Sequence, residues 1–448
     1  MSKKTVQDVD VKGKLVFVRC DFNVPLKEDG TIADDTRIEA ALPTIKYLQE
    51  QGAKVILASH LGRPKGEVKP EFSMRPVAQS LAQKLNTNVK LAGDVVGDSA
   101  KTMASGLQDG EVGLLENLRY GPREEANDKE FCEELANLGG GVEIYVNDAF
   151  GTAHRAHAST EGIAHEVDTA VAGMLMQKEI EELGAVVDNP EQPFVAILGG
   201  AKVSDKIGVI ENLMKKVEKI IIGGAMANTF LKAKGYDIGD SRYEADKLEE
   251  AKDIMKQAVE EGVEIVLPVD RRMAKIPGEE KLTPELVEKA EYKEVKLTTE
   301  KDVEEGKVES LAGWQVLDVG SRTLDYYADA LDGAKTIIWN GPLGYTESEK
   351  FAHGTEAIAN YIANSNAKCV IGGGDSVAAI NRIKKEAIES GEDPKKFDNI
   401  YTSTGGGASL EFIEGKKLPG IEALDDVAKQ NDRTDNGGNQ KSSQKIVE

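Results

Sequence analysis

Short apolar runs recur along the whole chain, and longer stretches with helical periodicity separate them. The runs are rich in β-branched residues and do not alternate apolar with polar positions, which is typical of parallel strands covered by helices on both faces. Alternation of such strands with helices predicts βαβ units, and hence an α/β protein with doubly wound parallel sheets. The expected strands are residues 15–18, 55–58, 112–115, 144–146, 194–198, 220–222, 265–267, 336–339 and 369–371.

A change of pattern near the middle of the chain divides these units into two groups. Residues 174–183 have a helical pattern, and Pro190 and Pro193 end that helix before the next strand. We therefore expect one domain over residues 1–183, a linker over 184–193, and a second domain over 194–402. Two segments are expected to be peripheral: residues 279–310 are highly charged, and residues 426–448 have the polar composition of a disordered tail.

Composition narrows the classes of partner. The 448 residues carry a formal net charge of −22, which repels nucleic acid and anionic lipid, so any cluster that binds phosphate must be local. Cys20, Cys132 and Cys369 are far apart and form no zinc-type spacing, which favours buried thiols in a reduced compartment. With no apolar run of membrane-spanning length, we expect a cytoplasmic protein that binds neither membranes nor nucleic acid.

Five glycine-rich loops punctuate the second half of the chain, most of them directly after an apolar run. Glycine there lets backbone N–H groups crowd a phosphate. Neither common phosphate-loop fingerprint, G-x-x-x-x-G-K-[ST] or G-x-G-x-x-G, is present, so the prediction of a nucleotide site depends on context. The loops are Gly199-Gly200-Ala201-Lys202, Gly223-Gly224-Ala225-Met226, Asn340-Gly341-Pro342-Leu343-Gly344, Gly372-Gly373-Gly374-Asp375-Ser376 and Thr404-Gly405-Gly406-Gly407.

Two lysines follow the first of these loops. Lys202 and Lys206 are four residues apart, so they are expected to share one face at the start of a helix. Lysine is unfavourable beside the positive end of a helix dipole unless an anion binds there, which favours a phosphate site. A solvated lysine pair is equally compatible with the spacing.

The last two glycine loops also precede helical patterns. Asp375 is compatible with a helix N-cap, but beside a nucleotide triphosphate its carboxylate suits Mg²⁺, which takes one or two carboxylates together with phosphate oxygens. We favour the metal ligand. The bare amides of residues 405–407 suit a site where charge develops on a transferring phosphoryl group, and a flexible linker is the alternative.

Polar motifs follow the successive strands of the first half. Ligands bind at the carboxyl ends of strands in open α/β sheets, so these motifs are expected to gather at one edge and form a polyanion pocket. Any one arginine taken alone is more simply explained by a surface salt bridge, and His60 taken alone is equally compatible with a core position. The recurrence of these residues at strand ends favours a site. The candidate ligands are Arg37, His60, Arg63, Arg119 and Arg155.

Together these motifs resemble the phosphoglycerate kinase family over about residues 5 to 425. The resemblance is specific because nine motifs occur in the order of the family: RCDFNVPL, DDTRI, SHLGRP, LLENLR, VNDAFGTAHR, ILGGAKVSDKI, WNGPLG, IGGGDS and STGGGASLE. It implies two Rossmann-like domains joined by a hinge, with residues 403–425 returning to the first domain. It also implies reversible phosphoryl transfer between ATP and the carboxylate of 3-phosphoglycerate, a glycolytic step that gives ADP and 1,3-bisphosphoglycerate.

The resemblance carries roles over to individual positions. Those implied to bind the acid substrate are Asp21, Phe22, Asn23, Arg37, His60, Leu61, Gly62, Arg63, Arg119 and Arg155. Those implied to bind the nucleotide are Lys202, Lys206, Gly223, Gly224, Val316, Leu317, Asn340, Glu347, Gly373, Gly374, Asp375 and Ser376. The catalytic set is Arg37, Lys202, Lys206, Gly374 and Gly407, and Asp375 is the implied Mg²⁺ ligand.

The chain departs from the usual family pattern at a few positions near the expected nucleotide rim, namely Val316, Ser321 and Tyr345-Thr346. Two other classes of function are open from sequence alone. One is a noncatalytic two-domain protein that senses nucleotide or phosphorylated acid. The other is a Rossmann oxidoreductase, against which the missing glycine fingerprint counts. We expect a monomer whose partners are small-molecule substrates.

Overall fold

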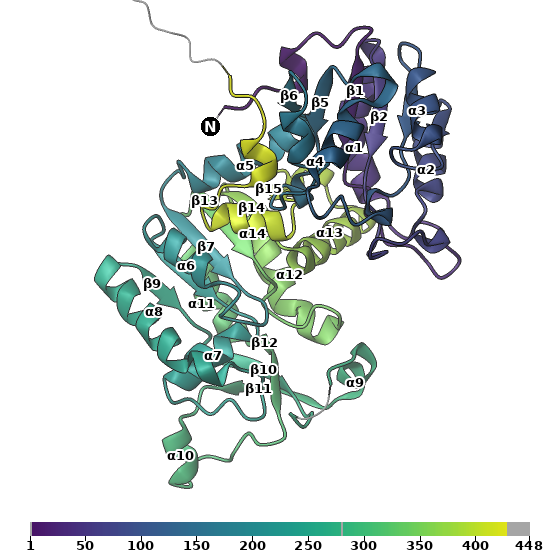
Figure 1. Ribbon diagram of the computed structural model, residues 1–448. Helices are drawn as coiled ribbons and strands as arrows, with labels where there is room; N and C mark the ends of the chain where they lie inside the picture. Colours follow the sequence, from purple (N-terminus) through teal and green to yellow (C-terminus); the bar gives the residue numbers. More distant parts are fainter. Residues whose placement is uncertain (1, 279–280, 428–448) are drawn as a thin grey trace, which may run out of the picture.

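Two α/β domains lie next to one another, each built on a six-stranded parallel sheet (Figure 1). The computed structural model describes residues 2–278 and 281–427, so the polar tail predicted from residue 426 lies almost wholly outside the described residues. Helices cover both faces of each sheet, as the unbroken apolar character of the strands predicts. In the part of the chain that the structure describes, no helix is both long and apolar enough to cross a bilayer.

The N-terminal sheet has the strand order β3-β4-β2-β1-β5-β6, with every pair parallel. After β1 the chain forms β2, β3 and β4 on one side of it. It then returns to form β5 and β6 on the other side, which creates a switch point between β1 and β5. The strands are β1 (Leu15–Arg19), β2 (Lys54–Ala58), β3 (Val89–Leu91), β4 (Val112–Leu114), β5 (Ile144–Asn147) and β6 (Ala170–Ala172).

Alternate side chains of β1 show how the sheet is covered on both faces. Leu15 and Phe17 pack in one core with α3 (Asp98–Ser105) and α4 (Lys129–Ala136). Val16 and Val18 pack in the opposite core with α1 (Thr36–Glu50) and α2 (Arg75–Leu85). Such a strand has no solvated face, so its sequence shows no polar alternation.

The C-terminal sheet repeats this design with the order β15-β14-β13-β7-β8-β9. All its pairs are parallel, and the switch point lies between β7 and β13. The strands are β7 (Phe194–Leu198), β8 (Lys219–Ile222), β9 (Glu264–Val266), β13 (Thr336–Asn340), β14 (Lys368–Gly372) and β15 (Ile400–Thr402). The helices are α6 (Ile207–Met214), α7 (Met226–Ala233), α8 (Leu248–Glu261), α11 (Ser321–Leu331), α12 (Glu349–Ala363) and α13 (Gly374–Glu389).

A small three-stranded sheet, absent from the expected strands, packs beside the second domain. Its antiparallel order is β11-β10-β12, formed by β11 (Tyr292–Lys296), β10 (Asp270–Ala274) and β12 (Gln315–Val319). The charged segment predicted to be peripheral contributes β11 and two short helices, α9 (Pro284–Lys289) and α10 (Glu300–Glu304). Strand β10 has the sequence DRRMA, so its charged residues explain why no apolar run predicts it.

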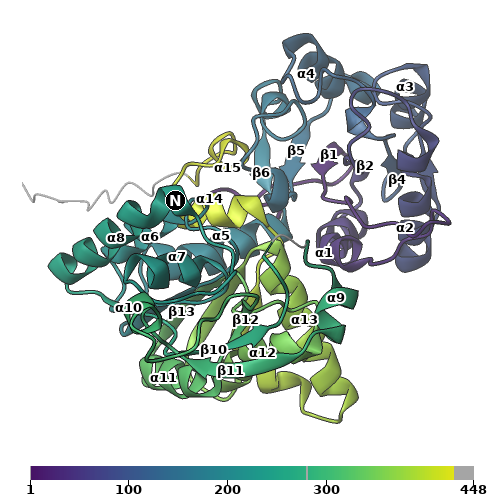
Figure 2. The ribbon, with the colours of Figure 1, turned by 90° about the horizontal axis from the view of Figure 1, so that it is seen from below.

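Helices near the middle and the end of the chain connect the two domains. Helix α5 (Met174–Val187) extends four residues into the stretch predicted to be a linker. Helices α14 (Gly407–Ile413) and α15 (Pro419–Glu422) lie between the two domains in both ribbon views (Figures 1 and 2). The rings of Phe150 and Phe412 meet edge to face with centroids 6.2 Å apart, so α14 shares a core with the first domain.

Candidate functional site

The switch point of the N-terminal sheet gathers the polar motifs of the first half. Directly after β1, Asp21 accepts two hydrogen bonds from the Arg37 guanidinium, at 3.0 and 3.1 Å, which holds the first turn of α1 against this edge. Asn23 in the same loop accepts from the Gly62 amide at 2.8 Å. The structure therefore brings Asp21, Asn23 and Arg37 together at the strand ends.

Burial keeps His60 neutral at the centre of this edge. Its side chain is buried, and its Nδ1 lies 3.1 Å from Nη2 of Arg19, which can only donate. Desolvation lowers the pKa of His60 well below its usual range, and the charges of Arg19, Arg119 and Arg37 lower it further. The imidazole thus accepts at Nδ1 and carries its proton on Nε2, where it can donate to an anion.

The remaining arginines surround the same point. Arg119 is largely buried, within 3.5 Å of Glu125, and burial lowers its pKa. The pKa of His157 falls to about 4, chiefly through burial, and the charges of Arg119 and Arg155 lower it further. The charge of Arg63 likewise lowers the pKa of Arg119. Both Arg63 and Arg155 are exposed. The structure brings the four predicted arginines and His60 to one edge.

Two predicted ligands can offer only their backbone. Phe22 and Leu61 are buried in the core beneath the loops. The Phe22 amide donates to the Ser59 hydroxyl at 2.9 Å, and the Leu61 carbonyl accepts from Asn117 at 2.7 Å. Together with the hydrogen bond from the Gly62 amide to Asn23, these contacts hold the loops after β1 and β2 against one another.

Sequence reasoning missed the residue that orients His60. Arg19 is 1% exposed, and its guanidinium contacts the Cys20 carbonyl, His60 and, at 2.7 Å, the Ser159 hydroxyl. Ser159 donates in turn to the buried carboxylate of Glu124 at 2.5 Å. The available signal was an arginine ending an otherwise apolar strand, a position that rarely carries a charge without a partner.

At the C-terminal switch point, glycines allow three loops to pack backbone against backbone. A Cβ on Gly224, whose φ is +66°, would lie 2.6 Å from backbone atoms of Gly200. The amides of Gly199 and Gly200 donate to the carbonyls of Asn340 and Pro342 at 2.9 and 3.0 Å, and that of Gly224 donates to Leu343. The expectation that the Gly199 loop offers free amides to a phosphate is therefore wrong for Gly199 and Gly200, because the neighbouring strand ends use them.

The lysine pair also differs from its expected placement. Helix α6 begins at Ile207, so Lys206 is its N-cap, and Lys202 lies in the loop before the turn that leads into the helix rather than on a shared helical face. The turn closes where the Lys206 amide donates to Val203 at 2.8 Å. The Lys206 ammonium donates to the side-chain oxygen of Asn340, and burial lowers its pKa against the raising effects of Asp205, Asp375 and Glu414. Lys202 is exposed.

The first turn of helix α13 lies close to Lys206 and contains polar groups without a hydrogen-bond partner among the described residues. Its N-cap is Gly373 with φ +93°, so Asp375 lies inside the first turn and is not the cap. Its carboxylate is exposed and makes no hydrogen bond with the described residues, whereas the Ser376 hydroxyl donates to the Gly372 carbonyl at 2.7 Å. The described chain likewise offers no acceptor to the amides of Gly374 and Asp375. Free amides and a free carboxylate suit a phosphate with a divalent cation.

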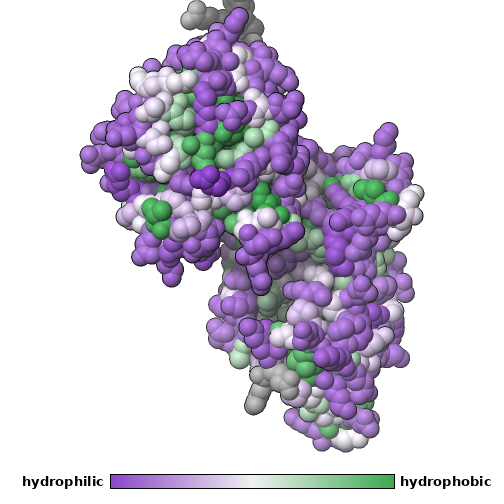
Figure 3. All heavy atoms as spheres, turned by 90° about the vertical axis from the view of Figure 1, so that its right-hand side faces the viewer, coloured by the Kyte–Doolittle hydropathy of each residue, from purple (hydrophilic) through white to green (hydrophobic). Residues whose placement is uncertain are grey.

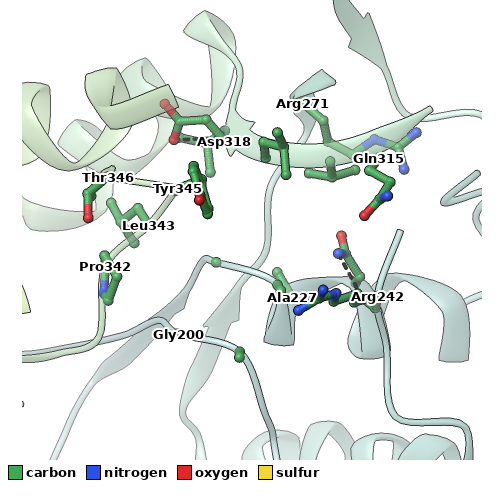
Figure 4. Close-up of a pocket in the computed structure, with 18 of the residues that line it drawn as sticks. Gly200, Ala227, Arg242, Arg271, Gln315, Asp318, Pro342, Leu343, Tyr345 and Thr346 are labelled. Atoms are coloured by element: carbon green, nitrogen blue, oxygen red, sulfur yellow. Dashed lines mark hydrogen bonds between the residues drawn. The ribbon is translucent and has the colours of Figure 1, made fainter. Parts of the chain in front are cut away.

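A cavity of about 340 Å³ opens between these loops and the small sheet (Figure 4). Five of the predicted nucleotide residues line it: Gly224, Val316, Leu317, Glu347 and Asp375. The others, Lys202, Lys206, Gly223, Asn340, Gly373, Gly374 and Ser376, lie outside its lining. Of the departures from the family pattern, Val316, Tyr345 and Thr346 line the cavity, but Ser321 instead binds Glu294 outside it.

One further loop connects the two edges. The Gly405–Gly407 loop begins where Glu179 of α5 accepts from the Ser403 hydroxyl and from the Thr404 amide, both at 2.7 Å. A Cβ on Gly407 would lie 3.5 Å from Nε2 of His154, in the first domain. The amide of Gly407 thus lies at the boundary between the domains.

An open cleft of about 1480 Å³ separates the facing surfaces of the two domains. Residues 29–36 with part of α2 form one wall, and α13 forms much of the other. The space-filling view shows two largely hydrophilic lobes with a hollow between them (Figure 3). Asp29 and Asp34 lie on the first wall, whereas Arg382 and Lys385 on the second pair with glutamates of their own domain.

Known proteins match this chain over almost its whole length. Residues 6–416 match the family model described as phosphoglycerate kinase. A phosphoglycerate kinase of Clostridium botulinum (strain Alaska E43 / Type E3) is 54% identical over 95% of this chain and 99% of its own, and one of Clostridium perfringens (strain 13 / Type A) is 52% identical over the same shares. The structure of phosphoglycerate kinase from Coxiella burnetii is similar with a TM-score of 0.79 and 39% identity, covering 94% of this chain and 98% of that one.

Proposed function

Because the chain belongs to the phosphoglycerate kinase family, we propose that its two sheet edges act together as one phosphoryl-transfer site. The enzyme is a phosphotransferase of glycolysis that transfers a phosphoryl group between ATP and the carboxylate of 3-phosphoglycerate, giving ADP and 1,3-bisphosphoglycerate. The family assignment excludes a Rossmann oxidoreductase. The two edges have different ligands: the arginine edge binds the acid, and the glycine edge binds the nucleotide.

The arginine edge holds the acid substrate. Its phosphate and carboxylate are anions, and Arg37, Arg63, Arg119 and Arg155 supply cations, with His60 donating from Nε2. Asp21 keeps the Arg37 guanidinium in one orientation, so one side of its planar fork remains free for the reacting oxygens. Asn23 and the Gly62 backbone fix the loops beneath the substrate.

The glycine edge holds the nucleotide. The base and ribose occupy the cavity lined by Gly224, Val316 and Leu317, with Glu347 bonded to ribose hydroxyls. Gly223 and Asn340 contribute from just outside this lining. The phosphates extend toward Lys202, Lys206 and the first turn of α13, including Gly373 and Ser376. The free carboxylate of Asp375 fits a Mg²⁺ ion bound to phosphate oxygens, which would neutralise charge on the transferring group.

Transfer needs both edges at once, because the attacking carboxylate and the nucleotide start on different domains. The amides of Gly374 and Gly407 and the ammonium groups of Lys202 and Lys206 then surround the transferring group with donors, and Arg37 reaches it from the other side. Closure of the cleft, with bending near residues 184–193, excludes water that would hydrolyse the acyl phosphate product.

One observation carries the assignment of the acid site. His60 is buried at this sheet edge with Nδ1 3.1 Å from Arg19, and its Nε2 makes no hydrogen bond with a described residue. The exposed Arg63 and Arg155 form no ion pair with the described residues, so an anion can bind these unused donors. A protein that only sensed nucleotide would not need this second set of donors.

A coupled assay with ATP, Mg²⁺ and 3-phosphoglycerate tests the proposal. We expect turnover by the parent and a loss on the order of 10² or more in kcat for Arg37→Ala and Lys202→Ala, as when one transition-state donor is removed. Arg75→Ala is the matched control, because Arg75 is exposed on α2 and has no ion pair with a described residue. No turnover by the parent would reject the enzyme, and parental rates in Arg37→Ala would reject its role.

Closure has a separate test in small-angle scattering. We expect the radius of gyration to fall when nucleotide and 3-phosphoglycerate bind together, and equal dimensions with and without both substrates would count against closure. We further propose that the enzyme is cytoplasmic and monomeric, and sedimentation of the purified enzyme tests the monomer.

A further inference from the structure

A buried network of hydrogen bonds lies beneath the arginine edge and ends at His60. Arg19 and Glu124 are each 1% exposed, and Ser159, which is fully buried, lies between them. Nε of Arg19 donates to the Ser159 hydroxyl at 2.7 Å, and that hydroxyl donates to Oε1 of Glu124 at 2.5 Å. Nη2 of Arg19 lies 3.1 Å from Nδ1 of His60. Four side chains from four separate segments of the chain thus form one network.

The chemistry of the guanidinium fixes the direction of every bond in this network. An arginine has only donors, so the Ser159 oxygen must accept from Arg19, and its own proton is left for Glu124. For the same reason His60 must accept at Nδ1 and keep its proton on Nε2. Nε2 has no partner among the described residues and is not enclosed in the core, so an anion can reach it.

The backbone around Ser159 is held from two sides. Its carbonyl accepts from the Tyr145 hydroxyl of β5 at 2.7 Å, and its amide donates to Oε2 of Glu124 at 3.1 Å. The Ala158 amide donates to the Glu124 carbonyl at 2.9 Å. Glu124 therefore binds Ser159 through both carboxylate oxygens, which holds the hydroxyl at the position where Arg19 meets it.

Glu124 also supplies the negative charge that a buried Arg19 needs. Burial raises the pKa of Glu124, and the charge of Arg19 is the largest of the effects that oppose this rise. Arg19 makes no direct ion pair with a described carboxylate, so its link to Glu124 runs through the Ser159 hydroxyl. Because a buried charge without a partner is costly, loss of Ser159 or Glu124 would release Arg19 from this position.

We infer that Glu124 and Ser159 are positioning residues for acid binding, which act through Arg19 to fix the tautomer and orientation in which His60 donates from Nε2. Both are buried, so neither contacts the substrate. The inference rests on the proposed function, in which His60 binds the acid. The network lies wholly within the first domain, so its effect falls on the affinity for 3-phosphoglycerate and not on the nucleotide.

Steady-state kinetics of Ser159→Ala separate this role from a structural one. We expect the KM for 3-phosphoglycerate to rise on the order of tenfold, the effect of weakening one hydrogen bond to a charged ligand. The kcat and the KM for ATP should stay within about twofold of the parent, because the weakened contact is made equally in the ground state and the transition state. Ser73→Ala is the matched control, since it removes a serine-to-glutamate bond of 2.8 Å, to Glu116, that does not reach Arg19.

Nitrogen NMR reports on the His60 ring independently of turnover. The chain has five histidines, so labelling histidine with nitrogen-15 gives few signals, and His60→Gln identifies those of His60. In the parent we expect one ring nitrogen with the chemical shift of an acceptor and the other with that of an N–H donor. In Ser159→Ala the two shifts should move toward one another as the ring exchanges between tautomers, whereas in Ser73→Ala they should stay apart.

Glu124→Gln keeps the inference testable if Ser159→Ala does not fold. A glutamine places an N–H group opposite one of the two Ser159 donors, so the network breaks while Ser159 and Arg19 are both present, and we expect the same changes in KM and in the nitrogen shifts. Absence of turnover in the parent would reject the proposed function, and the NMR measurement would still test the network. Unchanged nitrogen shifts in both variants, or shifts that move while the KM for the acid stays parental, would overturn the inference.

Discussion

Asp148 gives a sharp test of how burial acts on one carboxyl group. It follows β5 and is fully buried, and its Oδ1 accepts from the amides of Leu175 and Met176, at 3.0 and 3.2 Å, in the first turn of α5. Burial raises its pKa from 3.8 to about 6, although these amides and the Thr44 hydroxyl act in the opposite direction. The folded protein therefore holds the Asp148 proton more tightly than the unfolded chain does.

The sign and size of the effect come from linkage. When a group has a higher pKa in the folded protein than in the unfolded chain, binding its proton stabilises the fold. This contribution is fully present below the unfolded pKa and is lost as the pH rises through the folded pKa. A shift of about two units corresponds to roughly 3 kcal/mol in total, of which about 1.4 kcal/mol is lost between about pH 5 and about pH 8. Asp148→Asn cannot ionise, so it should not lose this contribution.

Urea unfolding of the parent and of Asp148→Asn across this pH range measures the effect. We expect the free energy of unfolding of the variant, relative to the parent, to rise by about 1 to 2 kcal/mol between about pH 5 and about pH 8. Any constant cost of the asparagine amide cancels in that difference, and Asp109→Asn, at an exposed position, controls for surface charge. A flat difference for Asp148→Asn would show that the buried carboxyl does not titrate as described.

Three further predictions concern packing and burial. Gly224→Ala should lower the free energy of unfolding, measured in urea, by roughly 2 to 4 kcal/mol, and Gly235→Ala by only about 1 to 2 kcal/mol. Both glycines have a positive φ, but only at Gly224 would a Cβ meet backbone atoms. Equal losses would contradict the packing of the loops. Glu179→Ala should lower the free energy of unfolding by about 2 to 4 kcal/mol in the same measurement, because it removes the acceptor for Ser403 and Thr404. Glu181 is exposed on the same helix, so Glu181→Ala should cost little. Similar losses for the two variants would show that these buried hydrogen bonds do not stabilise the fold. The three buried thiols have raised pKa values, so Ellman's reagent should label them orders of magnitude more slowly in the native protein than in urea, and rapid native labelling would refute their burial.

The local pattern was enough to predict most strands of both sheets and the polar residues at their ends, but it missed β3 and β6, which are only three residues long. A strand buried on both faces is apolar throughout, and its carboxyl end is where the chain can turn polar, so both signals lie within a few residues of one another. The fold class and the five ligands at the first edge followed from this pattern, and the structure gathers Arg37, His60 and Arg119 as expected.

Features that depend on distant partners could not be predicted in the same way. Strand β10 carries adjacent arginines, and only pairing with β11 and β12 makes it a strand. The amides of Gly199 and Gly200 are used because Asn340 and Pro342, about 140 residues later, supply their acceptors. Arg19 could not be distinguished from a surface arginine until Ser159 and His60 were placed around it.

The position of the last described residues bears on the order in which the chain can mature during synthesis. The Asp425 amide donates to Ala170 of β6, its carbonyl accepts from Lys4, and the Gly420 amide donates to Ala153, each at 2.8 Å. The first domain leaves the ribosome hundreds of residues before these partners exist. Its sheet can form early, but the ends of β6 and the loop at Ala153 gain these partners only after residues 420–425 have been synthesised. The contacts beside the arginine edge are therefore completed only after the second domain has been made.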